Sequence, residues 1–379
     1  MIGWYIHHQG QGHLHRAVTL ARSLSPDTPV TGFSSRPAPA GWPGEWVQLA
    51  PDWEEGPTEA HADAGGALHW APLGHHGLRE RSAQISAWIR EAGPELFIAD
   101  VSVEAALLAR LHGVPVVTVA LPGDRTDPAH ELGYRISEAV LGFWPASAEG
   151  ILRGPGFLPM PQPDGVGMSG SPGHERGVEA PDGGNAPPRN APPSRATPSA
   201  PSFCALGGLS RFAPQDEAPT AVGPHRGPHV LLLNGRGGGE LPPQAERAIA
   251  EALPEAEVTV LGGEHWTEDP WPLLQRADVV VTAAGQNAVA EVAASRTPAV
   301  VLSHERPHQE QEFMRRTLLR GPWPAVAAPE EQTAPAWGRA LREAMALDGT
   351  GWESWCDGRA AQRFLAALEE IRLRTGGSR

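Results

Sequence analysis

The sequence predicts an α/β protein with two Rossmann-like, doubly wound domains that face each other across a cleft. Its 379 residues are more than one hydrophobic core usually covers, which favours two domains. In both halves, short apolar segments typical of strands alternate with segments of helical spacing. Each half also places a glycine loop directly after its first strand, at residues 7–12 and 236–240.

Four apolar strands organise the first half of the chain. The apolar residues between Leu14 and Leu24 recur with helical spacing, and residues 103–113 form a second predicted helix that Gly113 closes. Strands separated by helices in this way favour a parallel sheet. The predicted strands lie within residues 2–6, 29–33, 95–100 and 114–121.

Residues 161–202 interrupt this alternation. They contain 10 prolines and 7 glycines, and their only large apolar residues are Val166, Met168 and Val178. Such a stretch cannot bury enough surface to offset its ordering entropy, so we expect a low-complexity, disordered insert. A linker between the two domains is the alternative.

The second half repeats the pattern. Residues 203–212 still read as a strand and turn of the first domain, so we expect domains of residues 1–221 and 222–379. The predicted strands lie within residues 229–235, 257–263, 278–285 and 298–305. The predicted helices lie within residues 242–253, 272–277, 286–295, 310–321 and 358–374, the last of which is a candidate to pack back on the N-terminal domain.

Composition excludes several classes of protein. The net charge of −14 argues against nucleic-acid binding, because phosphate backbones need a basic footprint. All 30 basic residues are arginines, so a P-loop lysine and a Schiff-base lysine are excluded. Cys204 and Cys356 form neither a CxxC pair nor a disulfide framework, which is typical of a cytoplasmic protein. No secretory signal or spanning apolar run is read, so membrane contact is expected to be peripheral at most.

A glycine loop and a histidine follow the first strand. Gly10 and Gly12 let the backbone turn sharply and approach a ligand at the start of the helix. His15 stands where a dinucleotide-binding fingerprint has its third glycine, although Arg36 after the second strand would suit the 2′-phosphate of NADP. His13 is placed to accept a proton or contact a phosphate, with a capping or surface role as the alternative.

The strand–helix–strand unit of the second half carries the largest set of candidate ligand-binding residues. Gly285 ends a strand and opens a helix, so the amides around Gln286 and Asn287 would form an anion site. Glu291 lies about one helical turn further on, within reach of a ribose diol. The polar loop of residues 304–311 would lie beside the same crevice.

These motifs resemble those of GT-B glycosyltransferases, especially the MurG-like and UDP-glycosyltransferase families. "GQGHLHR" at residues 10–16 is similar to the G-x-G-H segment of MurG-like enzymes, and "GQNAVAE" and "PHQEQ" are similar to their donor-site segments. The resemblance implies the GT-B fold and transfer of a sugar from a nucleoside-diphosphate sugar, with UDP favoured, to an unidentified hydroxyl acceptor. It also implies inversion at the anomeric carbon. No cofactor is expected, and no D-x-D motif stands at a strand end to hold a metal.

The resemblance implies a role for each matching residue. His13 would face the acceptor as a base or a phosphate partner. Two positions depart from the family pattern. Ala283 stands where related enzymes often have a histidine or arginine that contacts phosphate, and the aspartate of the family's D-Q pair is not clear here, where Gln309 precedes "EQ". The expected donor ligands are Gly285, Gln286 and Asn287 for the diphosphate, Glu291 for the ribose, Glu310 and Gln311 for the sugar hydroxyls, and Gly235, Arg236 and Gly237 on the phosphate side.

Further candidates come from residue type and position. Asp100 ends a strand at the cleft, where it would orient a histidine or the acceptor, or cap a loop. Trp266 follows another strand and could stack on a nucleobase. Four histidines lie close in sequence but fit no standard metal-ligand spacing, so no metal site is expected. They are His61, His69, His75 and His76.

Three other functions stay open at this point. A nucleotide-sugar epimerase of the same fold would convert the donor alone. An NADP-dependent reductase would use the first glycine loop and Arg36, and would leave the second-half motifs unexplained. A non-catalytic binder of nucleotide sugar or glycan is consistent with Ala283. The acceptor of a transferase would be a glycan, a lipid-linked sugar or a small molecule.

Overall fold

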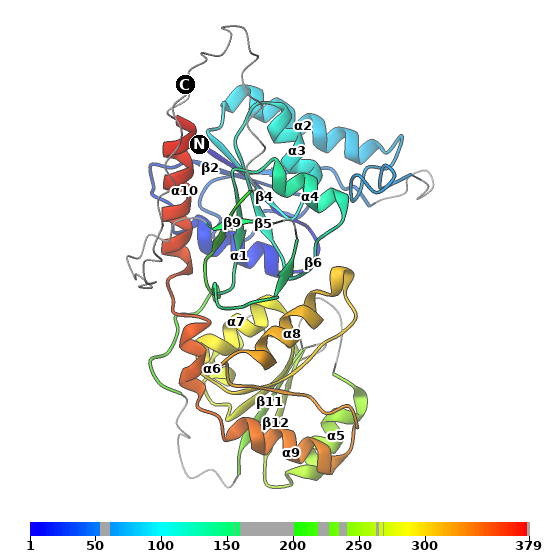
Figure 1. The fold of residues 1–379 in the computed structure, drawn as a ribbon, viewed down its shortest axis with the longest axis vertical. Coiled ribbons are helices and arrows are strands. Elements are labelled where there is room, and N and C mark those ends of the chain that lie inside the picture. Colours follow the sequence, from blue (N-terminus) through cyan, green and yellow to red (C-terminus); the bar gives the residue numbers. More distant parts are fainter. Residues whose placement is uncertain are drawn as a thin grey trace, which may run out of the picture.

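The computed structural model describes residues 1–53, 61–154, 156–159, 201–218, 227–234, 241–262, 265–267 and 269–376. Its two parallel sheets stand one above the other, each covered by helices (Figure 1). This confirms the predicted pair of Rossmann-like units. Of the predicted insert, only Pro201 and Ser202 are described, and Ser202 already belongs to a strand. The predicted domain boundary near residue 222 lies outside the described residues.

The first sheet has eight parallel strands in the order β3-β2-β1-β4-β5-β7-β10-β9. Its strands are β1 (Ile2–Tyr5), β2 (Val30–Ser34), β3 (Glu45–Gln48), β4 (Leu96–Asp100), β5 (Val116–Ala120), β7 (Ala139–Gly142), β9 (Leu158–Pro159) and β10 (Ser202–Ala205). Its helices are α1 (Gly12–Ala21), α2 (His76–Ala92), α3 (Val103–Leu111) and α4 (Pro128–Arg135). A small ribbon pairs β6 (Gly123–Asp124) with β8 (Leu152–Arg153).

The second sheet has five parallel strands in the order β12-β11-β13-β14-β15. Its strands are β11 (His229–Leu233), β12 (Glu257–Leu261), β13 (Val279–Ala283), β14 (Ala299–Leu302) and β15 (Ala325–Ala327). Its helices are α5 (Pro243–Ala252), α6 (Trp271–Leu274), α7 (Gln286–Ser295), η2 (Pro307–Gln309), α8 (Glu310–Arg320), α9 (Ala334–Met345) and η3 (Gly349–Ser354).

Both sheets change direction of strand order beside their first strand, at β1/β4 and at β11/β13. Ligands of doubly wound folds bind outside the carboxyl ends of the strands at such switch points. The two switch points turn toward each other, because the loops after β1 and β13 line a common cavity. Strand order therefore places the candidate site between the two sheets.

Helices on both faces of the first sheet bury its central strands. The central strands β1, β4 and β5 are buried at every position, as expected of parallel strands between helix layers. One cluster of buried residues joins the two sheets, with Trp144 and Ile151 from the first domain and Met314 and Trp355 from the second.

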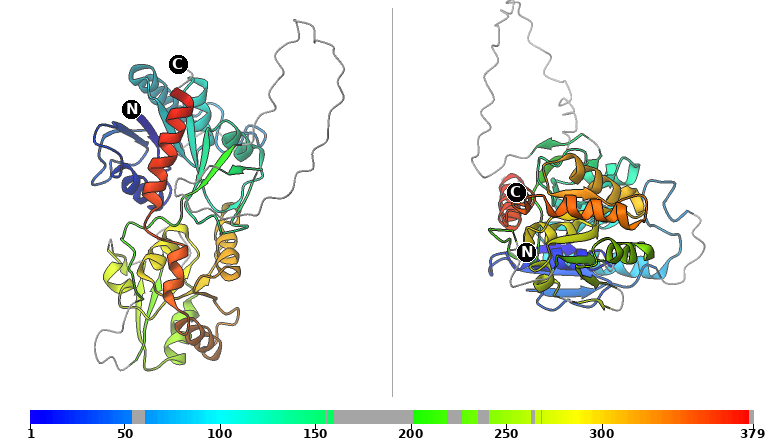
Figure 2. Two further views of the ribbon diagram at one scale, coloured as in Figure 1. Left: turned by 60° about the vertical axis from the view of Figure 1, so that its left-hand side comes forward. Right: turned by 90° about the horizontal axis from the view of Figure 1, so that it is seen from below.

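The chain returns from the second domain to the first, where its last helix, α10 (Ala360–Gly376), packs against the first domain (Figure 2). Phe364 stacks at a tilt against Trp4, with ring centroids 5.6 Å apart. Arg372 and the N-terminal amine both bind Glu95, at 2.8 and 2.9 Å. The chain therefore begins and ends on the same domain of the structure.

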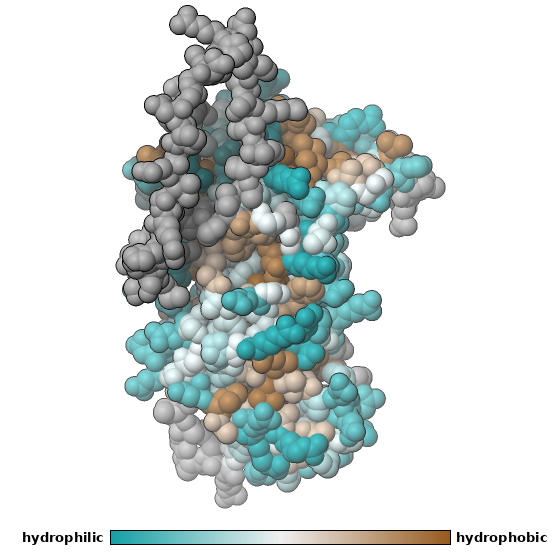
Figure 3. Space-filling model, viewed as in Figure 1, coloured by the Kyte–Doolittle hydropathy of each residue, from teal (hydrophilic) through white to brown (hydrophobic). Residues whose placement is uncertain are grey.

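The surface mixes hydrophilic side chains with small apolar areas on the face shown in Figure 3. Among the described residues, no helix combines the length and the apolar character that crossing a bilayer requires.

Candidate functional site

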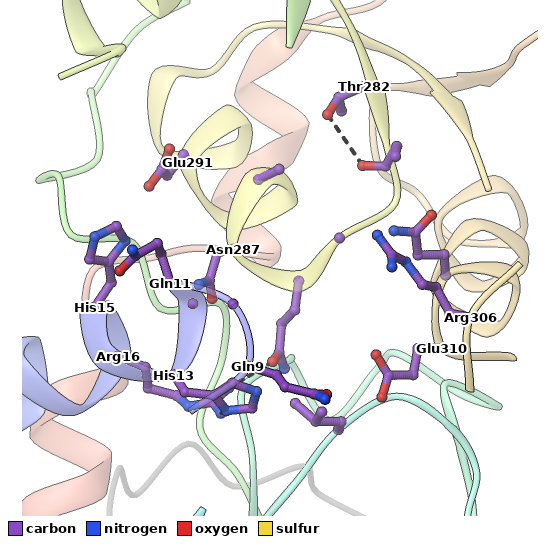
Figure 4. A pocket seen from close by; sticks show the side chains of 18 of the residues that line it. Gln9, Gln11, His13, His15, Arg16, Thr282, Asn287, Glu291, Arg306 and Glu310 are labelled. Atoms are coloured by element: carbon purple, nitrogen blue, oxygen red, sulfur yellow. Dashed lines mark hydrogen bonds between the residues drawn. The ribbon is translucent and has the colours of Figure 1, made fainter. Parts of the chain in front are cut away.

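A cavity of about 570 Å³ lies between the two domains. Its size is typical of a pocket for a ligand of several rings. The loop after β1 and the start of α1, with Gly10, Gly12 and His13, line it together with the start of α7. Figure 4 shows the α1 side chains His13 and Arg16 close to the start of α7, where Asn287 lies against α1.

His13 lies in the first turn of α1 and contacts the carboxylate at the end of β4. Its Nδ1 is 3.1 Å from Oδ2 of Asp100, and Asp100 is only 1% exposed. Arg16, one turn along α1, donates to the other oxygen, Oδ1, at 2.6 Å. The Nη2 atom of Arg16 that donates this hydrogen bond also lies 3.0 Å from His13 Nδ1. A ring proton on Nδ1 would face Asp100 Oδ2 and leave Nε2 as a proton acceptor, whereas a bare Nδ1 would accept from Arg16.

Charges around this group fix the ionisation of Asp100. Burial alone would raise the pKa of its carboxyl, but Arg16 and His13 outweigh burial and lower the pKa to about 2. Asp100 is therefore an anion at any physiological pH. Beside it, burial and the neighbouring His13 and His8 lower the pKa of His7 to about 3, so His7 is a neutral imidazole.

Contacts across the cleft tie this group to the second domain. Arg16 also donates to Oε1 of Gln286 at 2.9 Å, so one buried guanidinium joins Asp100 to the first residue of α7. Gly12 packs against the Asn287 amide, and a side chain at residue 12 would collide with it. The Asn287 side chain would therefore have to move to make room for a larger residue at position 12.

The start of α7 has the backbone geometry on which the predicted anion site depends. Gly285 is the N-cap of the helix, as predicted, and no side-chain cap is made there by the described residues. The first amide groups of a helix have no partner within it, so those of Gln286 and Asn287 are available to a ligand. Both residues line the cavity.

Glu291 lies in the next turn of α7, and it too lines the cavity. Its Oε1 accepts a hydrogen bond from Nε of Arg211 at 2.8 Å. Burial raises the pKa of Glu291, and the Arg211 cation opposes that rise. A ligand that hydrogen-bonds to Glu291 would therefore share it with Arg211 or displace it.

The two residues predicted to bind sugar hydroxyls have different surroundings. Both line the cavity at the start of α8. Gln311 accepts the backbone amide of His304 at 2.8 Å, which fixes the loop after β14. Glu310 binds Arg125 of the first domain at 2.5 Å, so it forms a second polar link across the cleft.

The remaining predicted donor residues are distributed as follows. Trp266 lines the cavity, and Ala283 ends β13 beside it. Gly235, Arg236 and Gly237 lie outside the described residues.

Arg36, the candidate 2′-phosphate ligand, is not among the residues that line this cavity. It donates instead to the carbonyl of His8 at 2.5 Å. This contact occupies Nε of the guanidinium.

The four histidines that are close in sequence do not come together. His75 caps α2 by accepting the amide of Leu78, and His76 is exposed beside Glu80. His69 instead contacts His130 of α4, with Nε2 and Nδ1 3.1 Å apart. Burial, Arg125 and His69 lower the pKa of His130 to about 3.

Sequence reasoning missed several residues of the cavity. Arg16 could have been found, because it lies three residues after His13 and so shares its helix face. Arg211 and Arg125 gave no local signal, since their partners lie 80 and 185 residues away. His130 and His308 also went unnoticed for this reason.

Comparison with known proteins finds likeness in structure only. No family model matches the chain, and no curated protein matches its sequence. The glycotransferase of kitacinnamycin is 16% identical, with a TM-score of 0.56 over 99% of this chain and 95% of its own. MurG of Acinetobacter baumannii is 14% identical, with a TM-score of 0.56 over 97% and 99%.

A plant structure is similar to the same extent. UGT2 of Phytolacca americana, complexed with UDP-2fluoro-glucose and pterostilbene, is 14% identical, with a TM-score of 0.57 over 98% of this chain and 99% of its own. Each likeness covers at least 97% of this chain and so spans both domains. The chain therefore has the GT-B fold that its paired motifs predicted.

Proposed function

We propose that the chain is a glycosyltransferase that moves a sugar from a nucleoside-diphosphate sugar to a hydroxyl acceptor. One observation carries the proposal: contacts run without a break from His13 through Asp100 and Arg16 to Gln286. They join an oriented imidazole on one domain to an anion-binding helix end on the other. The GT-B fold and the likeness to a glycotransferase and to UGT2 support the same function.

The acceptor side supplies the base. His13 Nε2 accepts the proton of the acceptor hydroxyl while Asp100 holds the ring through Nδ1 and stabilises the imidazolium that forms. The hydroxyl oxygen forms a bond to the anomeric carbon. The bond between that carbon and the diphosphate oxygen breaks, and the nucleoside diphosphate leaves with the electron pair.

The donor side stabilises the leaving group. The free amides at the start of α7, around Gln286 and Asn287, bind the diphosphate without needing a metal. Glu291 binds the ribose diol, and Glu310 and Gln311 bind the sugar, as the resemblance implies. Trp266 stacks on the base, and Gly235, Arg236 and Gly237 complete the phosphate side.

We propose that the transfer inverts the anomeric carbon, as the resemblance to MurG-like enzymes implies. We further propose a cytoplasmic location, which two free and buried cysteines support. The partners are a nucleotide-sugar donor, with UDP favoured, and an unidentified acceptor.

Calorimetric titration tests the donor site. UDP, GDP, dTDP, ADP and NADP⁺ are titrated with and without Mg²⁺ into wild type, Glu291→Ala and Glu343→Ala, the last being an exposed helix glutamate as control. We expect one nucleoside diphosphate to bind without metal, more weakly in Glu291→Ala and unchanged in Glu343→Ala. If only NADP⁺ binds, and Glu291→Ala does not change its affinity, the chain is a reductase rather than a glycosyltransferase.

A second assay separates transfer from the two other functions. The intact donor that matches the bound diphosphate is incubated with a panel of hydroxyl acceptors. Release of diphosphate that depends on acceptor supports transfer. Conversion of the donor without acceptor supports the epimerase, and binding without any turnover supports the non-catalytic binder.

A further inference from the structure

Four side chains that are common metal ligands converge at one edge of the cavity, although the sequence predicted no metal site. They come from three segments: His69 before α2, Asp127 and His130 at the start of α4, and His308 in η2. One ligand atom of each lies within 4.8 Å of those of the other three. Three belong to the first domain and His308 belongs to the second.

The ligand atoms lie near the spacing of a tetrahedral ion. Bonds of about 2.0–2.1 Å to zinc place tetrahedral ligand atoms about 3.3 Å apart. His69 Nε2 is 3.1 Å from His130 Nδ1, and Asp127 Oδ1 is 3.4 Å from His69 Nε2. The other oxygen, Oδ2, is 3.8 Å from His308 Nδ1 and hydrogen-bonded to His130 Nδ1 at 2.6 Å. Metal binding would therefore break this hydrogen bond and turn the carboxylate so that one oxygen serves as ligand.

We propose that His69, Asp127, His130 and His308 bind one divalent transition-metal ion of the zinc class, which bridges the two domains. Ions of this class bind readily to imidazole nitrogens and carboxylate oxygens, whereas Mg²⁺ and Ca²⁺ prefer sites made of oxygen ligands. The site is independent of the proposed sugar transfer, because none of its ligands takes part in the step assigned to His13 and α7.

Neighbouring charges permit a dication. Arg125 lies beside the ligands, with Nη1 3.3 Å from Nε2 of His130, but its charge is balanced by Glu310 at 2.5 Å. Without metal, a ring proton of His130 on Nδ1 would face Asp127 Oδ2, and Nε2 would accept from Arg125 Nη1. Metal binding through Nδ1 moves that proton to Nε2, so the contact between Nε2 and Nη1 must lengthen, while Nη2 of Arg125 keeps Glu310 and the Pro122 carbonyl as acceptors.

The backbone presents His308 to the first domain. His308 and Gln309 both have positive φ, 57° and 56°, a conformation that non-glycine residues seldom adopt. The His308 carbonyl packs against Gly123 of β6, where any Cβ would collide with it. The loop is therefore held in an uncommon conformation that directs His308 toward Asp127, as a domain-bridging ligand requires.

Metal titration of the full-length, tag-free protein tests the site. Chelator-stripped wild type is titrated with ZnCl₂ by calorimetry and with Co²⁺ by visible absorption. We expect one equivalent of each and the spectrum of tetrahedral cobalt. His130→Ala and Asp127→Asn should weaken binding at least about 100-fold, since losing even an outer-shell partner costs 10–100-fold. His76→Ala and His112→Ala, which remove histidines elsewhere, should bind as wild type does.

The bridging role has its own readout. In solution scattering, we expect Zn²⁺ to reduce the radius of gyration of the wild type but not that of His308→Ala. We also expect His308→Ala to bind Zn²⁺ at least about 10-fold more weakly than the wild type does. If His130→Ala proves misfolded by circular dichroism, His69→Gln and His308→Gln, at half-buried positions, replace it. Absence of stoichiometric binding to wild type, or equal binding by all variants, would overturn the site. Tight binding that ignores His308 would overturn the bridge.

Discussion

The two sides of the cavity are built from different kinds of groups. The first domain contributes charged side chains already bound to one another, with Asp100 held between His13 and Arg16. The second domain contributes the backbone amides of α7 together with side chains such as Glu291, Glu310 and Gln311. The first arrangement suits proton transfer, and the second suits binding of a diphosphate and its ribose. Variants on the two sides should therefore change different measurable quantities.

The largest expected effect is that of His13→Ala. Loss of the base should lower kcat by about 10²–10⁴-fold, while the Kd of the nucleoside diphosphate stays within about 3-fold of wild type. Initial rates of transfer and calorimetry measure the two quantities. His112→Ala, on the surface of the first domain, is the control. A parallel loss of diphosphate affinity would show that His13 acts on the donor side.

Asp100→Asn should have the next largest effect, on stability as well as rate. It leaves the buried Arg16 guanidinium without its carboxylate, which typically costs about 3–5 kcal/mol of unfolding free energy. Urea unfolding followed by tryptophan fluorescence measures this, with the exposed Asp27→Asn as control. An unchanged unfolding midpoint would show that Arg16 is compensated by other groups.

Glu291→Ala should act on the donor side alone. Loss of a charged hydrogen-bond acceptor costs about 1.5–3 kcal/mol, so diphosphate affinity should fall about 10–100-fold. The proton-transfer step should be spared, so the pH profile of kcat at saturating donor should match that of wild type. A shifted pH profile would contradict the separation of the two sides.

The smallest effect concerns His7, which His8, His13, Asp100 and Arg81 surround. Its pKa of about 3 in the folded chain lies below the unfolded value of about 6.5, so the unfolded state binds the extra proton between these values. Unfolding free energy should therefore fall as pH drops below 6.5, by about 1 kcal/mol per unit from His7. His7→Asn should reduce this slope in urea unfolding at pH 7.5, 6.5 and 5.5. An equal slope in the variant would contradict the assignment.

Local patterns in the sequence predicted much of the fold and part of the cavity. The strands β1, β4, β5, β11 and β13 were predictable because each is a continuous apolar run. The start of α7 was predictable because Gly285 follows such a run. The positions of Gly12 and His13 also follow from one short motif.

What could not be predicted depends on distant parts of the chain. The half-exposed strand β3 lacks the apolar run of a central strand, because it lies at the sheet edge. The pairing of Arg211 with Glu291 and the approach of His308 to His130 arise only when separate segments fold together. Charged partners at such separations leave no periodicity in the sequence.

The return of α10 to the first domain has a consequence for synthesis on the ribosome. Residues 2–4 emerge early, yet the Phe364 side chain that covers Trp4 is made only after the whole second domain. Part of the core of the first domain therefore stays exposed until the second domain and α10 have been translated. We expect a nascent chain that stops before residue 360 to expose this apolar surface to chaperones, even though every residue of the cavity has already been made.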